Sequence, residues 1–188
     1  MPSLRLFIAI ETPTDIRPQL GAIRDHLKSS NAGVKWESDE KLHVTLKFLG
    51  NTDDQLLPQI VYTIEGVGQR SAPLEVRYKG VGCFPNPTSP RVIWIGVEDQ
   101  KDNLNPVQRE IESSLIHLGF EREEKEFHPH VTLGRVKGTS GINSLLRTME
   151  SITFESQPVT IREIALIKSE LHPEGSIYTT LKRIPLGK

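Results

Sequence analysis

The chain has 188 residues, enough for one sizeable domain or for two small lobes that share a core. Its net charge is −1, with 23 basic and 24 acidic residues, which excludes a broadly basic protein that coats nucleic acid. The single cysteine, Cys83, excludes an internal disulfide and a cysteine-based zinc cluster, and it fits the reducing cytoplasm in which we expect the protein to reside.

The first half of the chain predicts three strands and two helices. Strands are indicated where apolar and β-branched residues gather between turn formers, and helices where apolar residues recur at helical spacing. The first strand is apolar, but it is short and carries Arg5, so it does not indicate a signal peptide. In chain order we expect a strand at 3–11, a helix between Thr14 and Asn31, a short strand at 34–37, a histidine-containing strand at 42–49 and a helix at 53–69.

The second half repeats this kind of series and adds strands at its end. Residues 80–90 are rich in glycine and proline, which favours a loop or a bulged ribbon. The other expected elements are a strand at 74–78, a strand at 91–97, a helix at 102–118, a second histidine-containing strand at 130–136, a short helix at 141–150, and strands at 152–161, 163–171 and 177–184.

The order of these elements predicts an α+β fold rather than a parallel doubly wound sheet. The repeat is too long for a solenoid, and no low-complexity linker divides the chain. We therefore expect residues 1–188 to form a single bilobal domain with two pseudo-symmetric halves, in which two mainly antiparallel sheets face a central cleft and the helices lie outside. No apolar run reaches the roughly 18 residues of a membrane span, and the size of the chain favours a monomer.

A four-residue motif occurs twice, once in each half. The first motif is His43-Val44-Thr45-Leu46 and the second motif is His130-Val131-Thr132-Leu133. Side chains alternate between the two faces of a strand, so the histidine and threonine of each motif share one face and the aliphatic residues share the other. Each strand therefore presents an imidazole and a hydroxyl on the side opposite its apolar anchor.

Chance does not explain this pair. Six histidines and thirteen threonines in 188 residues predict about 0.4 His-x-Thr triplets, and the matching valine and leucine lower the expectation much further. A duplicated strand that merely kept its sequence is the alternative. Packing alone, however, has no use for histidine and threonine on the polar face.

Two imidazoles that flank a common point suit a displacement at phosphorus. The unperturbed pKa of histidine is about 6.5, so near neutral pH one ring can be neutral and the other protonated. One histidine can then take a proton from the attacking oxygen while the other gives a proton to a leaving ribose oxygen. The hydroxyls of Thr45 and Thr132 are donors for the non-bridging phosphate oxygens. The residues alone do not decide which histidine is the acid.

The chain resembles the 2H phosphoesterase superfamily, and within it the RNA 2′,3′-cyclic phosphodiesterases, also called 2′-5′ RNA ligases. The resemblance covers essentially the whole chain and rests on the paired motifs, the Arg5-Leu6-Phe7-Ile8-Ala9-Ile10 strand and the run Pro129-His130-Val131-Thr132-Leu133-Gly134-Arg135. It implies hydrolysis of an RNA 2′,3′-cyclic phosphate to a 2′-phosphomonoester without metal or cofactor, and a weak reversible 2′-5′ ligation. It also implies that His43 donates a proton to the 3′ oxygen and that His130 accepts one from water.

Three residues beyond the motifs are further candidates for substrate binding. A regular strand would place Arg135 opposite His130, but Gly134 permits a bulge that returns Arg135 to the phosphate, where its fork grips two oxygens. Lys47 lies on the His43 face by alternation and adds positive potential, with a solvated strand-end lysine as the alternative. Phe48 either stacks on a base or belongs to the core.

Other functions remain open at this point. His128 and His130 resemble a two-histidine metal clip, but no third ligand with suitable spacing is visible, and we expect no metal. The expected partners are RNA with 2′,3′-cyclic phosphate ends, tRNA halves among them, or small cyclic nucleotides. The alternatives are a phosphodiesterase for another cyclic or 2′-5′-linked nucleotide, and a non-catalytic module that binds RNA ends.

Overall fold

The computed structural model describes residues 3–187, which form strands and helices in mixed order. The strands are β1 (Ser3–Glu11), β2 (Val34–Trp36), β3 (His43–Asp53), β4 (Leu74–Phe84), β5 (Val92–Asp99), β6 (His130–Val136), β7 (Val159–Ile161), β8 (Glu163–His172) and β9 (Gly175–Pro185). The α-helices are α1 (Arg17–Lys28), α2 (Leu57–Arg70), α3 (Leu104–Ser114) and α4 (Ile142–Ser151). The predicted α+β class is confirmed.

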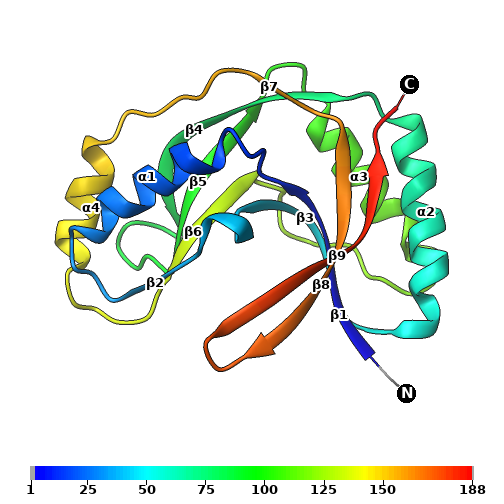
Figure 1. The fold of residues 1–188 in the computed structure, drawn as a ribbon, viewed down its shortest axis with the longest axis horizontal. Coiled ribbons are helices and arrows are strands. Elements are labelled where there is room, and N and C mark those ends of the chain that lie inside the picture. The colour runs from blue at the N-terminus through cyan, green and yellow to red at the C-terminus, as the bar shows by residue number, and fades with distance from the viewer. Residues whose placement is uncertain (1–2, 188) are drawn as a thin grey trace.

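One curved antiparallel sheet runs through both halves of the molecule (Figure 1). Its strand order is β7-β4-β5-β6-β3-β1-β8-β9, and β2 pairs with β6. The two strands that carry the motifs, β3 and β6, are neighbours in the middle and pair at Val44 and Val131. The two sheets expected from the sequence are therefore continuous with one another through this pair.

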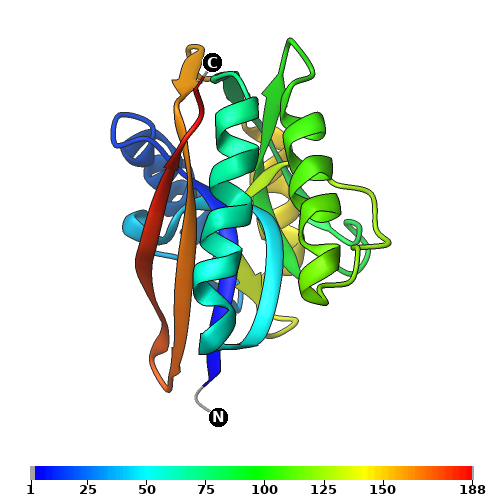
Figure 2. The same ribbon diagram turned by 90° about the vertical axis from the view of Figure 1, so that its right-hand side faces the viewer.

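The helices form two pairs at opposite ends of the sheet (Figures 1 and 2). Helices α1 and α4 lie together, α1 against β6 and α4 against β4, while α2 and α3 lie together over β3, β8 and β9. Helix α1 belongs to the first half but packs on β6 of the second half, and α3 belongs to the second half but packs on β3 of the first half. Each motif strand is thus covered by a helix from the other half. This exchange ties the two halves to one another.

The main hydrophobic core lies between the sheet and the helices. Alternate strand residues such as Ile8, Val44, Ile95 and Leu133 point toward the helices and are buried there. Burial of each such side chain stabilises the fold by about 1.5–3 kcal/mol relative to its exposure to water. A smaller apolar cluster lies on the opposite face and consists of Phe7, Ala9, Ala165 and Ile167, with Tyr178 against it.

The predicted boundaries hold for most elements and differ at several places. Strand β3 continues past residue 49 to Asp53, and α2 begins at Leu57 after a 3-10 turn at Asp54–Leu56. Strand β4 continues through Gly80 to Phe84 and pairs with β5 with a register shift, so the bulged ribbon is correct for residues 80–84 and the loop for residues 85–90. The strand expected at 152–161 shrinks to β7, because only residues 159–161 form a continuous ladder with β4, while Glu155 makes an isolated bridge to Lys79. Helix α3 ends at Ser114, and a single 3-10 turn at Ile116–Leu118 follows it. Within residues 3–187 no helix has both the length and the apolar character needed to span a membrane.

Helix α2 packs against the end of β9 through a glycine, which generates a stability prediction. A Cβ at Gly68 would lie 2.5 Å from the Pro185 carbonyl oxygen, whereas one at Gly66 would meet only the flexible end of Arg70 at 3.2 Å. We expect Gly68→Ala to lower the free energy of unfolding by about 1–3 kcal/mol through overpacking. Gly66→Ala on the same helix should leave it unchanged or raise it by up to about 1 kcal/mol. Urea denaturation of both variants checks this, and equal effects would contradict the close approach.

Candidate active site

The antiparallel pairing of β3 with β6 brings the two motifs together. Val44 lies opposite Val131, so His43 falls beside Thr132 and Thr45 beside His130. Both valines are buried beneath the helices, and the histidines and threonines therefore occupy the other face. A local twofold relation through the valine pair makes the two motifs equivalent in backbone position.

Both imidazoles are oriented by a backbone carbonyl two residues earlier. Nδ1 of His43 lies 2.7 Å from the Lys41 carbonyl oxygen, and Nδ1 of His130 lies 2.6 Å from the His128 carbonyl oxygen. A carbonyl only accepts, so Nδ1 carries the hydrogen in each neutral ring. Nε2 is then the nitrogen that can exchange a proton with a substrate. The Thr45 hydroxyl lies 3.1 Å from Nε2 of His43 and can donate to it.

Burial lowers the pKa of both histidines. For His43 and His130 alike, desolvation is the largest cause and disfavours the charged ring. The carbonyl hydrogen bond to each ring acts in the opposite direction and raises the pKa. The positive charge of Arg135 lowers the pKa of both rings, and the charge of His130 lowers that of His43. Both imidazoles therefore lie in the field of the same arginine.

Aromatic rings surround each imidazole in a matching arrangement. The centroid of the His43 ring lies 4.9 Å from that of Phe7 and 5.5 Å from that of Tyr178. The centroid of the His130 ring lies 4.9 Å from that of Phe84 and 6.4 Å from that of Trp94. Tyr178 and Phe84 meet the imidazoles edge-on, at interplanar angles of 82° and 85°. These rings cover part of each imidazole, and burial is the largest cause of the lowered pKa of both histidines.

Nothing in the sequence directly indicated Phe7, Phe84 or Tyr178 as site residues. Each lies on a strand other than those that carry the motifs, and each reaches the site only through strand pairing. Alternation along β1 does place Phe7 and Ala9 on one face. That signal becomes informative only when the partner of β1 is known.

Each motif strand contains one extra residue directly after its threonine. Along β3, Ala9 pairs with Thr45 but Ile8 pairs with Lys47, so Leu46 is the extra residue. Along β6, Trp94 pairs with Thr132 but Ile93 pairs with Gly134, so Leu133 is the extra residue. A bulge of this kind reverses the alternation beyond it.

The bulges decide which side chains lie beside the histidines. Phe48 lies on the His43 face, with an exposed fraction of 65% and its ring centroid 6.1 Å from that of Phe7. The alternative that Phe48 belongs to the core is wrong. Arg135 pairs with Val92, two residues before Trp94, and so lies on the His130 face, beyond the bulge at Leu133 that the neighbouring Gly134 permits.

The prediction that Lys47 lies on the His43 face is wrong. Its side chain is only 4% exposed and points toward the helices, where its ammonium nitrogen lies 2.5 Å from a Glu112 carboxylate oxygen. The prediction assumed regular alternation, and the extra residue at Leu46 turns Lys47 to the other side. Lys47 is therefore excluded from substrate contact.

No cluster of three or more histidine, cysteine, aspartate or glutamate side chains that suits a metal is found among residues 3–187. The ring of His128 is exposed and lies 3.8 Å from Glu126, while its carbonyl orients His130. His128 thus contributes to the site through its backbone, and the two-histidine clip lacks a third side chain in the described part of the chain.

Comparisons with known proteins agree with this duplicated arrangement. The family profile described as LigT like Phosphoesterase matches residues 10–94 and again residues 95–178, one match for each motif. The RNA 2′,3′-cyclic phosphodiesterase of Archaeoglobus fulgidus is 37% identical over 180 residues, which cover 95% of this chain and 98% of that protein. The RNA 2′,3′-cyclic phosphodiesterase of Thermotoga maritima is 35% identical and covers 95% of this chain and 93% of that protein.

Solved structures share the fold over its full length. The protein TT0787 of Thermus thermophilus superposes with a TM-score of 0.83 at 26% identity, covering 98% of this chain and all of that one. The E. coli LigT structure complexed with 3′-AMP superposes with a TM-score of 0.79 at 24% identity and covers all of both chains, which shows a common fold. The repeated family match confirms that the fold contains two repeated halves.

The lowered histidine pKa values predict a dependence of stability on pH. Below the unfolded pKa of about 6.5 the unfolded chain binds protons at these positions more readily than the native protein does. The stability that the two neutral rings contribute is therefore complete above the unfolded pKa, and it is lost as the pH falls from there through the lower pKa of the native rings. We expect the drop in melting temperature between pH 7.5 and pH 5.5 to be smaller in His43→Gln and His130→Gln than in the wild type. A drop of the same size in both variants would show that the pKa of neither imidazole is lowered in the native protein.

Proposed function

The chain belongs to the LigT-like phosphoesterase family, and from this we propose that it hydrolyses RNA 2′,3′-cyclic phosphate ends to 2′-phosphomonoesters. The observation that carries the proposal is the pairing at Val44 and Val131, which sets two histidine–threonine pairs on one face. Relatives of 30–37% identity over nearly the whole chain bear the name of that activity. We further propose that the two halves act as one bilobal domain, because the sheet is continuous and each half packs a helix on the other.

The proposed reaction is a displacement by water at the cyclic phosphorus. Nε2 of His130 takes a proton from water as its oxygen bonds to phosphorus, and Nε2 of His43 gives a proton to the 3′ oxygen as the bond from phosphorus to that oxygen breaks. The order of these roles follows the family resemblance, since the two rings are held by equivalent carbonyls. Burial supports the neutral base at neutral pH and makes the protonated ring a stronger acid.

The remaining groups hold the phosphate and the base. The hydroxyls of Thr45 and Thr132 donate to the non-bridging oxygens, where charge builds up during the displacement. The guanidinium of Arg135 adds a paired hydrogen bond to the same oxygens. The exposed ring of Phe48 offers a surface on which a base stacks. Acid, base and anion-binding groups are all supplied by side chains, so we propose that no metal or organic cofactor takes part.

The proposed chemistry suits a class of substrates rather than one particular nucleic acid. RNA ends, tRNA halves, cyclic mononucleotides and 2′-5′ oligoadenylate all present a phosphate to the same pair of imidazoles. Ligation by a 2′-5′ bond would be the same displacement with a ribose 5′-hydroxyl in place of water as the nucleophile, and the 3′ oxygen would again be the group that leaves. Rates measured on each of these substrates in parallel rank the classes. We propose a cytoplasmic location, where such RNA ends occur.

Removal of either imidazole tests the proposed chemistry. His43→Ala and His130→Ala should each lower kcat on an oligonucleotide with a 2′,3′-cyclic phosphate end by about 10²–10⁴-fold, because each ring transfers a proton in the transition state. His26→Ala, an exposed histidine on α1, is the control and should retain full activity. The assay contains EDTA and follows release of the 2′-phosphomonoester. A wild-type protein that binds the RNA end but does not open its cyclic phosphate would support the binding-module alternative instead.

Arg135 should contribute binding and transition-state energy through its fork of donors. We expect Arg135→Ala to lower kcat/KM by about 10²-fold, as the loss of one preorganised donor to a developing oxyanion does. Arg135→Lys should recover only part of the loss, because an ammonium cannot grip two oxygens at once. Lys137→Ala, at an exposed position directly after β6, is the matched control. Steady-state kinetics of the three variants decide the matter, and an unaffected Arg135→Ala would remove this residue from the site.

A further inference from the structure

The two halves are joined by a buried ion pair next to the proposed active site. Lys47 lies on β3 directly after the bulge, and Glu112 lies on α3 in the second half. Their side chains are 4% and 9% exposed, and the nitrogen–oxygen distance is 2.5 Å. Desolvation of two charges costs about as much as their attraction returns, so apolar residues of similar volume are often as stable. Stability alone therefore gives little reason for a charged pair at this position.

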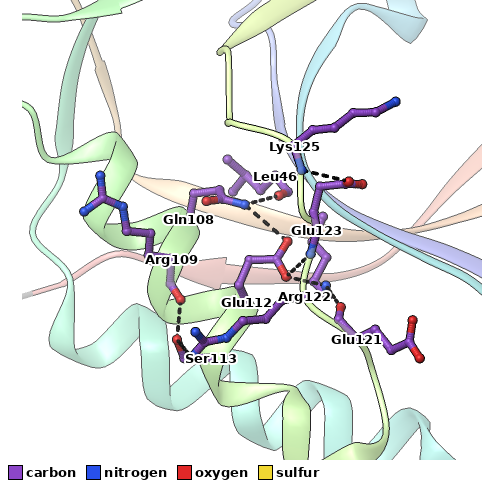
Figure 3. Close-up of polar contacts among 10 residues, drawn as sticks. Leu46, Gln108, Arg109, Glu112, Ser113, Glu121, Arg122, Glu123 and Lys125 are labelled. Atoms are coloured by element: carbon purple, nitrogen blue, oxygen red, sulfur yellow. Dashed lines mark hydrogen bonds and ion pairs between the residues drawn. The ribbon is translucent and has the colours of Figure 1, made fainter.

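The same two side chains also hold the segment that leads into the second motif. Residues 120–129 have no helix or strand and end directly at His130. The Lys47 ammonium donates to the Glu121 carbonyl oxygen at 2.7 Å, and the Glu123 amide donates to Glu112 Oε2 at 3.3 Å. Figure 3 shows Glu112 reaching this segment from α3. An irregular segment is thus fixed by a pair that belongs to another strand and helix.

A third side chain connects the pair to the bulge of β3. Gln108, one helical turn before Glu112, is 7% exposed. Its amide nitrogen donates to Glu112 Oε1 at 3.2 Å and to the Leu46 carbonyl oxygen at 3.3 Å (Figure 3). Leu46 is the extra residue that turns Phe48 to the His43 face. The network therefore holds, by hydrogen bonds, both the bulge of the first motif and the segment that precedes the second motif.

We propose that Lys47, Glu112 and Gln108 are positioning residues that set the two histidine strands in register for the reaction. They act through the backbone: Gln108 fixes the bulge after Thr45, while Lys47 and Glu112 fix the segment whose His128 carbonyl orients His130. A displacement of about 1 Å at a reacting group costs on the order of 10²-fold in rate. This inference rests on the proposed function, because it concerns the geometry of that reaction.

The experiment separates positioning from stability. Glu112→Gln leaves the Lys47 charge buried without its partner and should lower the melting temperature by about 10 °C. The double variant Lys47→Met/Glu112→Leu removes both charges and should melt within about 5 °C of the wild type. We nevertheless expect its kcat to fall by about 10–100-fold with KM within about threefold, because the contacts to Glu121 and Glu123 are gone. The control is Glu110→Gln, on the same helix as Glu112, which breaks an exposed ion pair with Arg70 of α2.

Two further measurements keep the result decisive. Gln108→Leu introduces no unpaired charge and should show the same selective loss of kcat even where the double variant does not fold. Hydrogen exchange of residues 121–130 should be faster in the double variant and unchanged in Glu110→Gln. A kcat within about twofold of the wild type in Gln108→Leu, or unchanged exchange in the double variant, would overturn the proposal. A wild-type enzyme without hydrolytic activity would instead defeat the proposed function, and hydrogen exchange would still test the network.

Discussion

The rest of the structure depends on the antiparallel contact between Val44 and Val131. Because the strands run in opposite directions, this contact relates two identical motifs by a local twofold, so each histidine faces the other motif's threonine. Because side chains alternate, the buried valines force all four polar groups to the opposite face. The exchange of helices between halves then covers the apolar face and holds the strands together.

The environment of the histidines balances two opposing effects. Rings from β1, β4, β5 and β9 exclude water and favour the neutral imidazole. Backbone carbonyls favour the charged form and also fix the tautomer, leaving Nε2 free to act in both rings. The reaction proposed above uses one neutral and one protonated imidazole and would need both effects, since burial alone would suppress the acid.

The two motifs have the same backbone but different chemistry beyond the bulge. At the fourth position after histidine the first motif has Lys47, which reaches α3, and the second has Gly134, where a Cβ would lie 2.7 Å from Trp36. At the fifth position Phe48 and Arg135 occupy equivalent places on the site face. A symmetric frame therefore presents an apolar ring on one side and a cation on the other, which suits the asymmetric nucleotide of the proposed substrate.

The sequence alone determined the α+β class, the duplicated motif, most element boundaries and the common face of each histidine with its threonine, because periodicity and composition are local properties. The tertiary structure decided what depends on partner strands: the continuity of the sheet, the aromatic rings around each imidazole and the sides taken by Lys47 and Phe48. Gly134 hinted at a bulge in the second strand, but nothing near Leu46 did so in the first. A bulge exists only relative to the strand beside it, so its position is a property of the pair and not of either segment.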